Sequence, residues 1–259
     1  MALSIVAKTF LDILKINPYH DPTNGRFTSA PGGFAAASTI AEARDYAKTQ
    51  LGFKQVDYSY SYIDTKTGQQ VTGTLDIDTV NHINKTITDI QEKYPETKGY
   101  VQTMFCTNSN VYAAAVHSGR DASVHLAIGA KAFKDGIEAV EKNWQEDVDI
   151  GYHPQGTDAN AIFWHEYGHV FASIANMKEC GPGATTREKL NAVNNHTAET
   201  KWLEAVDSQA TTADYGNHIS RYAAKDNAEL FAESFAAHNT GNGTEWTAPI
   251  VKAAGADRR

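Results

Sequence analysis

Two histidines and a glutamate lie in a largely apolar stretch, residues 160–175, which reads NAIFWHEYGHVFASIA. His165 and His169 are four positions apart, so on a helix both imidazoles project from one face. Two imidazoles placed in this way can occupy adjacent corners of a tetrahedral zinc site, with Glu166 near the position that a catalytic site leaves open. This H-E-x-x-H pattern predicts a metal-activated water that attacks a carbonyl as Glu166 takes its proton.

A chance match of this pattern is the competing interpretation. The neighbouring side chains, which include Ile162, Phe163 and Trp164, are those of a core helix. Polar groups buried there without partners destabilise a fold, so the histidines and the glutamate must have something to bind. We therefore expect one Zn²⁺ per chain, held by His165 and His169.

A third protein ligand is required for such a site. The metzincin pattern would need glycine at 172 and histidine at 175, and both positions are alanine. Farther along the chain, Glu229 and Glu233 are four apart on a predicted helix, a spacing at which like charges repel unless a cation and a histidine lie nearby. We expect Glu229 to bind the metal and Glu233 to hydrogen-bond a ligand histidine, although the spacing alone also allows the reverse.

Both glutamates also have purely structural interpretations. With Asp226 as N-cap, Glu229 occupies the reciprocal position of a capping box, and Glu233 could face water. Other side chains are weaker candidates because no partner at helical spacing supports them as third ligands: His196, Asp214 and His218. Three further histidines could lie near the cleft without belonging to a motif: His117, His125 and His153.

The two motifs together resemble a known family. HEYGH followed by RYAAKDNAELFAESF is similar to the lethal-factor-like branch of the gluzincin metallopeptidases. The resemblance covers the chain from the central strands to the last helix, with a longer segment after His169 than that branch has. It implies a zinc endopeptidase with His165, His169 and Glu229 as ligands, Glu166 as general base, Tyr222 as donor to the scissile carbonyl, and Glu233 as support for a ligand histidine.

The rest of the chain predicts the elements that position these residues. Apolar and polar residues alternate over 54–64, which predicts a strand, and turn residues separate three further strands at 100–107, 110–118 and 123–133. Helices are expected where the apolar spacing is helical and capping residues occur: 38–51, 75–94, 135–145, the histidine helix capped by Thr157 or Asp158, 185–206 and 226–238.

Because strands come first and helices follow, we predict an α+β fold. A small mixed sheet would pack on the H-E-x-x-H helix with further helices C-terminal to it, and the resemblance implies a zincin-like arrangement. We divide the chain into an N-terminal helix and turn-rich arm (1–37), a metallopeptidase domain (38–248) and a C-terminal tail (249–259).

The arm carries a second resemblance. NPYHDPTNGRFTSAPGG is similar to the N-x-H-D-x-x-G-R-F-x-S segments of tailed-phage head and portal-associated proteins. It implies a phage or prophage origin, with phage head or portal proteins as partners that Arg26 and Phe27 would contact. An ordinary flexible linker is the alternative, because the stretch is rich in proline and glycine.

Composition narrows the possible environments. The 259 residues carry a net charge of −8, which argues against nonspecific nucleic-acid binding. Two cysteines, Cys106 and Cys180, give no disulfide framework. The sequence has no apolar run of the roughly 18 residues that a membrane span needs and lacks a signal-peptide pattern. We therefore expect a protein of the virion or the host cytoplasm.

Three functions follow from these features. The first is a zinc-dependent peptidase that acts on a protein or peptide substrate. The second is a virion structural or ejected protein whose metal site stabilises the fold. The third is a protease toxin that cuts a host protein. The presence of Glu166 and Tyr222 beside only three well-supported ligands favours the first.

Overall fold

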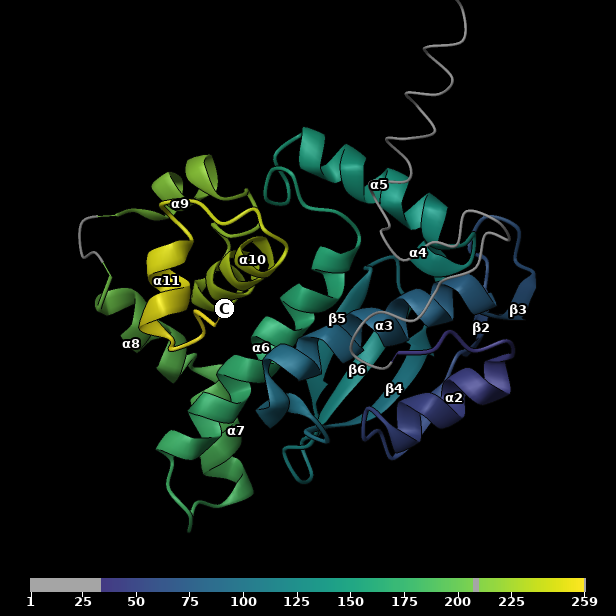
Figure 1. Cartoon of the computed structure of the whole chain (residues 1–259), viewed down its shortest axis with the longest axis horizontal. Coiled ribbons are helices and arrows are strands. Elements are labelled where there is room, and N and C mark those ends of the chain that lie inside the picture. Colours follow the sequence, from purple (N-terminus) through teal and green to yellow (C-terminus); the bar gives the residue numbers. More distant parts are fainter. Residues whose placement is uncertain (1–33, 207–209, 259) are drawn as a thin grey trace, which may run out of the picture.

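The computed structural model describes residues 34–206 and 210–258 (Figure 1). Most of the arm expected over 1–37 lies outside the described residues, as do its Arg26–Phe27 pair and the helix predicted at the N-terminus. The association with phage head or portal proteins therefore stays a sequence-based prediction.

Within the described residues, the strands form two sheets. The larger has the order β1-β4-β6-β5 and comprises, in that order, Gln55–Asp57, Val101–Thr107, Val124–Gly129 and Ala113–His117. β1, β4 and β6 are parallel, and β5 runs antiparallel at one edge. The smaller sheet is a hairpin of β2 and β3, Ser59–Ile63 and Gln70–Thr74. The prediction of an α+β fold with a small mixed sheet is confirmed.

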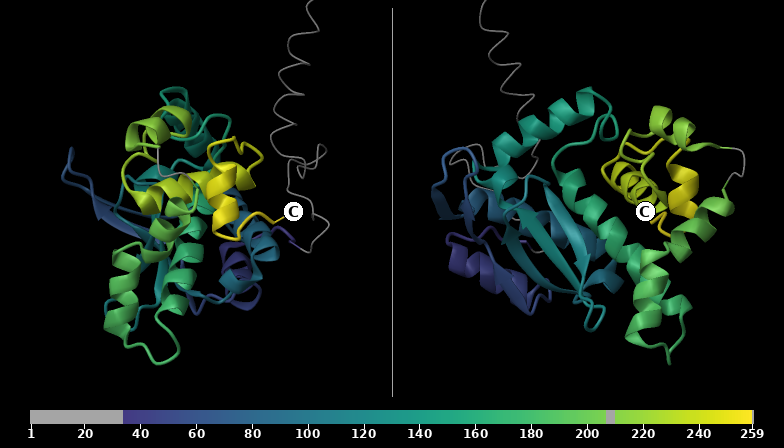
Figure 2. Two further views of the ribbon diagram at one scale, coloured as in Figure 1. Left: turned by 90° about the vertical axis from the view of Figure 1, so that its left-hand side faces the viewer. Right: turned by 180° about the vertical axis from the view of Figure 1, so that it is seen from behind.

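One hydrophobic core joins the larger sheet to the helices beside it (Figures 1 and 2). α3 (Ile77–Lys93) lies across the sheet and packs against α2 (Ile40–Thr49). Its fully buried side chains recur every three or four residues: Val80, Ile83, Ile87 and Ile90. The Asp76 carboxylate caps the first turn by accepting a hydrogen bond from the Thr79 N–H at 2.9 Å. The helix ends before Pro95, as predicted.

The strand predicted over 54–64 is two strands. The chain leaves the larger sheet at Tyr58, whose carbonyl accepts a hydrogen bond from the Leu75 N–H at 3.1 Å. The phenol of Tyr58 is buried and donates to Asn84 Oδ1. Apolar and polar residues continue to alternate through this point because both strands present one side to the interior. The sequence pattern therefore does not reveal that β1 pairs with β4 whereas β2 pairs with β3.

The strand predicted over 123–133 ends at Gly129, and the chain continues as α4 (Ala130–Phe133). A Cβ atom at Gly129 would lie 1.7 Å from the carbonyl oxygen of Val111. Only glycine therefore allows the two segments to pass so closely. The expectation of a continuous strand here was wrong.

The C-terminal half of the chain is helical, with α5 to α11 spanning Ile137–Asp149, Asn160–Glu179, Thr186–Asn194, Thr197–Glu204, Thr212–His218, Asn227–Asn239 and Ala248–Ala253. The single helix predicted over 185–206 was wrong. His196 has a φ of 50°, a left-handed conformation that interrupts the helix and separates α7 from α8.

The segment set apart as a C-terminal tail, 249–259, includes most of α11. Ile250 and Val251 are fully buried. The Tyr94 hydroxyl donates a hydrogen bond to the Ala256 carbonyl at 2.6 Å. This segment therefore packs on the same core as the rest of the domain.

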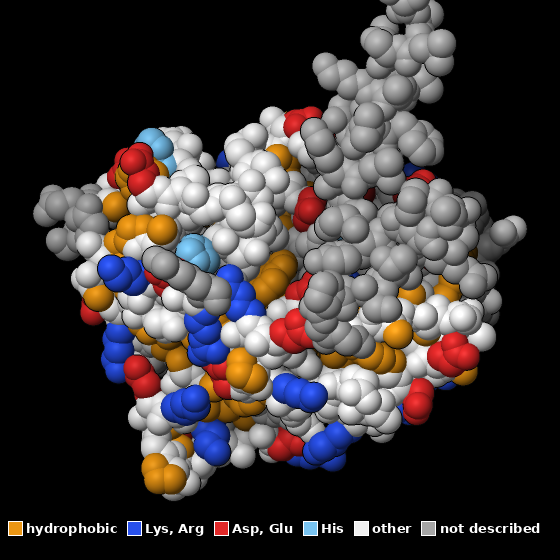
Figure 3. All heavy atoms as spheres, in the orientation of Figure 1, with side chains coloured by type: hydrophobic (Ala, Val, Ile, Leu, Met, Phe, Trp, Pro, Cys, Tyr) orange, Lys and Arg blue, Asp and Glu red, His pale blue; other side chains and the backbone are white. Residues whose placement is uncertain are grey.

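Acidic and basic side chains both lie on the face shown in Figure 3. The whole chain has a net charge of −8. Of the helices that the structure describes, none combines the length and the apolar character needed to cross a membrane.

Candidate metal site

α6, which carries the H-E-x-x-H motif, is buried on most sides. Most of its buried side chains are apolar, among them Ile162, Phe163, Val170 and Ala172. The N-cap is Ala159, not the predicted Thr157 or Asp158, and it forms no side-chain cap. The Thr157 hydroxyl instead accepts a hydrogen bond from Trp144 Nε1 at 3.1 Å. Asp158, one position before Ala159, accepts a hydrogen bond from the Asn160 N–H at 3.0 Å, so a local contact and tertiary contacts together support the start of this helix.

α10 crosses α6 where both helices carry small residues. A Cβ atom added to Gly168 would lie 3.0 Å from the Cα atom of Ala232 and 3.4 Å from the Cβ atom of Phe235. Asp226 caps α10 by accepting a hydrogen bond from the Glu229 N–H at 2.9 Å. The close approach brings the first turn of α10 beside the two histidines.

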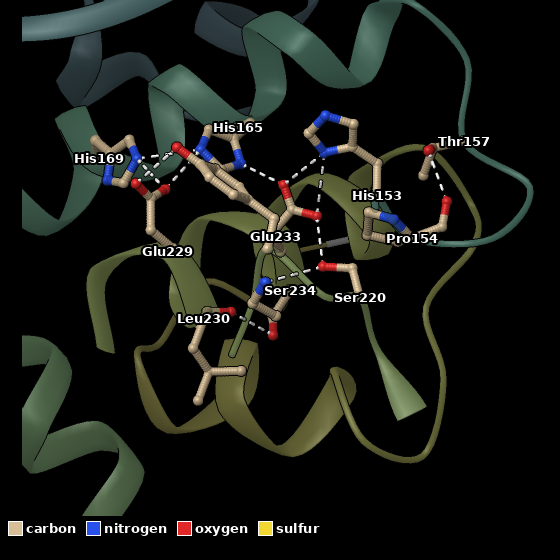
Figure 4. Close-up of polar contacts among 12 residues, drawn as sticks. His153, Pro154, Thr157, His165, His169, Ser220, Glu229, Leu230, Glu233 and Ser234 are labelled. Carbon is tan, nitrogen blue, oxygen red and sulfur yellow. Dashed lines mark hydrogen bonds and ion pairs between the residues drawn. The ribbon is translucent and has the colours of Figure 1, made fainter. Parts of the chain in front are cut away.

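His165, His169 and Glu229 face one another between these helices (Figure 4). The two Nε2 atoms lie 3.1 Å apart, and Glu229 Oε2 lies 3.0 Å from that of His165 and 3.2 Å from that of His169. Zinc bonds of about 2.0–2.1 Å at tetrahedral angles put neighbouring ligand atoms about 3.3 Å apart. The donor set therefore fits a zinc ion, and the group could bind a metal.

Proton sharing alone explains this arrangement poorly. The two imidazole nitrogens face each other and also converge on one carboxylate oxygen. If both nitrogens carry a hydrogen to bond Glu229, two N–H donors crowd each other at 3.1 Å, and if one does not, the carboxylate meets a lone pair. A cation at the centre of the three atoms satisfies all of them.

Glu233 lies behind His165. Its side chain is 1% exposed, so the interpretation in which it faces water was wrong. Glu233 Oε1 is 2.8 Å from His165 Nδ1, a close contact whose alignment departs from an ideal hydrogen bond. The Ser220 hydroxyl donates to Glu233 Oε2 at 2.8 Å, and His153 Nδ1 lies 3.2 Å from Oε1 (Figure 4). The structure therefore separates the two glutamates: Glu229 faces both histidines, and Glu233 supports one of them.

Opposite charges shift the pKa values across the site. Burial alone would raise the pKa of Glu229, but hydrogen bonds with His165 and His169 outweigh it and hold this pKa far below its usual range. Burial likewise opposes ionisation of Glu233, yet His153 and His165 lower its pKa to about 2. Burial would lower the pKa of His165, but Glu229 and Glu233 raise it to about 10. Protonation of His165 therefore competes with metal binding, because a ligand imidazole must be neutral.

Glu166 lies toward the edge of the larger sheet. Its Oε2 atom accepts a hydrogen bond from the Ala115 N–H of β5 at 2.6 Å, and the residue is 7% exposed. The contact shows that Ala115 turns its N–H away from β6 and toward the metal-site helix. The H-E-x-x-H glutamate is thus held between the edge strand and the histidines.

Tyr222 meets the other oxygen of Glu229. Its hydroxyl donates to Glu229 Oε1 at 3.0 Å, and its ring lies 5.7 Å from that of His165. Burial, together with the negative charge of Glu229, raises the pKa of Tyr222 well above its ordinary value. The phenol therefore keeps its proton and acts as a donor beside the three ligands.

Lys225 is a member of the site that the sequence reasoning missed. Its ammonium donates to Glu229 Oε1 at 2.7 Å and lies 4.9 Å above the Tyr222 ring. The four-residue spacing between Lys225 and Glu229 was the available signal, since such pairs commonly interact. Lys225 neutralises the carboxylate oxygen that does not face the histidines.

The other residues weighed from the sequence lie outside the ligand group. Among the described residues, the cluster with metal-ligand spacing contains only His165, His169 and Glu229. His117 bonds Ser173, His125 bonds Ser123, His196 lies beside Glu199, Asp214 closes the capping box of α9, and His218 stacks on Trp246. Cys106 and Cys180 are free thiols, and burial raises the pKa of Cys106 to about 12.

Comparison of the chain with known protein families, curated proteins and solved structures found no match.

Proposed function

We propose that this protein is a zinc-dependent peptidase that hydrolyses peptide bonds of a protein or peptide substrate, within a zincin-like fold. The observation that carries the proposal is the meeting of three ligand atoms, from helices about 60 residues apart in the chain, beside the H-E-x-x-H glutamate. The described cluster offers three protein ligands. A zinc site of that kind is typical of catalysis because water or substrate takes the fourth position.

The chain's own groups supply the remaining chemistry. A zinc ion held by His165, His169 and Glu229 would acidify a water molecule and polarise a carbonyl. Glu166, held by the Ala115 N–H, accepts the proton of the attacking water and returns it to the leaving amine. The protonated Tyr222 hydroxyl, which donates to Glu229 in this structure, would turn its hydrogen to the carbonyl oxygen as negative charge develops there.

The edge strand β5 supports an extended peptide as substrate. Among the described strands it pairs only with β6, so its other edge can offer backbone N–H and C=O groups other than the Ala115 N–H that bonds Glu166. A peptide in extended conformation binds such an edge by adding a strand. The contact between Ala115 and Glu166 marks the point along β5 beside which the scissile bond would lie.

Zinc content and cleavage of a broad peptide library test this function. We expect one zinc per chain, cleavage within peptides, and loss of cleavage with retained zinc in Glu166→Gln. A zinc-loaded protein that cleaves nothing in the library, and whose stability depends on the metal, would favour a purely structural site instead. Origin from a phage and action as a host-directed toxin are separate proposals, which rest on the sequence resemblances.

A further inference from the structure

A second imidazole shares the carboxylate that supports the metal ligand. His153 lies in the loop between α5 and α6, and its Nδ1 atom is 3.2 Å from Glu233 Oε1 and 3.4 Å from Oε2. An ionised carboxylate only accepts hydrogen bonds, so Nδ1 of His153 carries the proton and donates. Glu233 thus stands between two imidazoles, those of His153 and His165 (Figure 4).

The ring of His153 is held in one orientation by packing. It stacks on Trp144 with ring centroids 3.9 Å apart and an interplanar angle of 14°. Tyr152 and Tyr222 contact it edge-on, at 5.0 Å and 5.8 Å. Trp144 is itself fixed by the hydrogen bond from its indole N–H to Thr157. These contacts aim Nδ1 at Glu233.

The loop that carries His153 is joined to the segment before α10. The Gly151 carbonyl accepts a hydrogen bond from the Arg221 N–H at 2.9 Å, and the Tyr152 carbonyl accepts one from the Tyr222 N–H at 3.2 Å. Ser220, in the same segment, donates to Glu233. Glu233 is therefore the point at which α6, the loop of His153 and the segment before α10 are tied together.

We propose that His153 is a positioning residue for the metal site, which acts through Glu233 to hold His165 in its ligand orientation. The inference rests on the proposed metal site but not on peptidase activity. A buried carboxylate needs several donors to remain ionised and fixed. His153 and Ser220 supply two of them, so that Oε1 stays directed at His165 Nδ1. Without the His153 donor, Glu233 can turn away and His165 loses its support.

Zinc affinity, measured by competition with a chelator, tests this role. Outer-shell partners of ligand histidines contribute about 10–100-fold to metal affinity. We expect His153→Phe, which keeps a ring beside Trp144 but removes the donor, to weaken zinc binding about tenfold. His153→Asn, whose amide nitrogen falls near the position of Nδ1, should restore most of the affinity, whereas His153→Gln, whose amide nitrogen falls nearer Nε2, should not.

His218→Phe is the matched control. His218 also stacks on a tryptophan, Trp246, with centroids 4.2 Å apart, but it lies outside the metal-site network. We expect this variant to bind zinc as the parent does. The absorption spectrum of the Co²⁺-loaded protein should change in His153→Phe and not in His218→Phe, because only the former alters the surroundings of a ligand.

Two outcomes would overturn the inference. One is zinc affinity in His153→Phe equal to that of the parent. The other is equal weakening in His153→Asn and His153→Gln, which would show that the ring matters for packing and not for its hydrogen bond; this pair also decides the question if the Phe variant does not fold. A Glu233→Gln background should abolish the effect of His153→Phe. A parent that binds zinc but cleaves nothing would contradict the peptidase function and leave this test intact.

Discussion

The helix pair α6–α10 and the helices α7 and α9 are stabilised in opposite ways. α7 and α9 begin with capping boxes, Thr185 with Glu188 and Thr211 with Asp214. Few of their side chains are buried: α7 buries Val193, and α9 buries none. Local hydrogen bonds therefore hold these two helices.

α6 and α10 instead depend on distant parts of the chain. α6 has no side-chain cap, and both helices bury most of their residues against each other and the core. The same two helices carry the buried histidines and glutamates, which need partners from another element. The comparison teaches that the chemistry of this protein lies where tertiary contacts contribute more to the structure than local ones do.

The largest expected effect is on the rate of peptide cleavage, and it compares one glutamate from each region. Glu166→Gln on α6 should lower peptide cleavage by about 10²–10⁴-fold, because it removes the general base, and should leave zinc bound. Glu188→Gln on α7 is the control, since that carboxylate only closes a capping box. Rates of cleavage and zinc content of the two purified variants give the comparison. Equal activity in the two variants would remove Glu166 from the chemistry.

Two glycines test how closely the helix pair is packed, one within the pair and one in the loop before α7. Gly168→Val should destabilise the fold by about 1–3 kcal/mol and weaken zinc binding, because the added side chain meets the backbone of Ala232. Gly183 lies between α6 and α7, and nothing is within 4 Å of a Cβ atom added there. Gly183→Val should therefore change the folding free energy by no more than about 0.5 kcal/mol. Urea unfolding measures both. If Gly168→Val leaves stability and zinc binding unchanged, the two helices can separate without loss of the site.

Acidification should destabilise the helix pair through Glu233. Its folded pKa of about 2 lies below the ordinary value of 4.5, so the stability it contributes is present above pH 4.5 and is lost as the pH falls toward 2. Between pH 6 and pH 3, the metal-free parent should lose on the order of 2 kcal/mol more than Glu233→Gln. Urea unfolding at the two pH values measures this loss. Identical losses would mean that Glu233 gains nothing from its histidine and serine partners.

Helix caps give the smallest expected effect. Thr185→Ala on α7 and Asp226→Ala on α10 should each cost about 1 kcal/mol of folding free energy. Only Asp226→Ala should also weaken zinc binding, because Glu229 lies in the turn that Asp226 caps. Thermal unfolding and chelator competition on both variants provide the readouts. A zinc affinity lowered equally by both changes would contradict the division between the two regions.

Much of the architecture could be predicted from the sequence. The helix predicted over 226–238 is α10, Asn227–Asn239, and the strand predicted over 100–107 is β4, Val101–Thr107. Errors arose where a local pattern continued across a change of partner or conformation, at Tyr58, Gly129 and His196. His153 carried little signal because it lies in a loop, and the signal for Lys225 was its four-residue spacing from Glu229, which the sequence reasoning missed.

The sequence by itself determined that His165 and His169 share a helix face, since their spacing matches the helical repeat. It did not decide between Glu229 and Glu233, because both lie on one side of the later helix. The tertiary structure decided this. α10 crosses α6 at Gly168 and Ala232, which brings Glu229 to the Nε2 atoms and places Glu233 behind His165, beside His153. The spacing of residues determines which side chains share a helix face, but only the crossing of two helices determines which side chain of the other helix contacts that face.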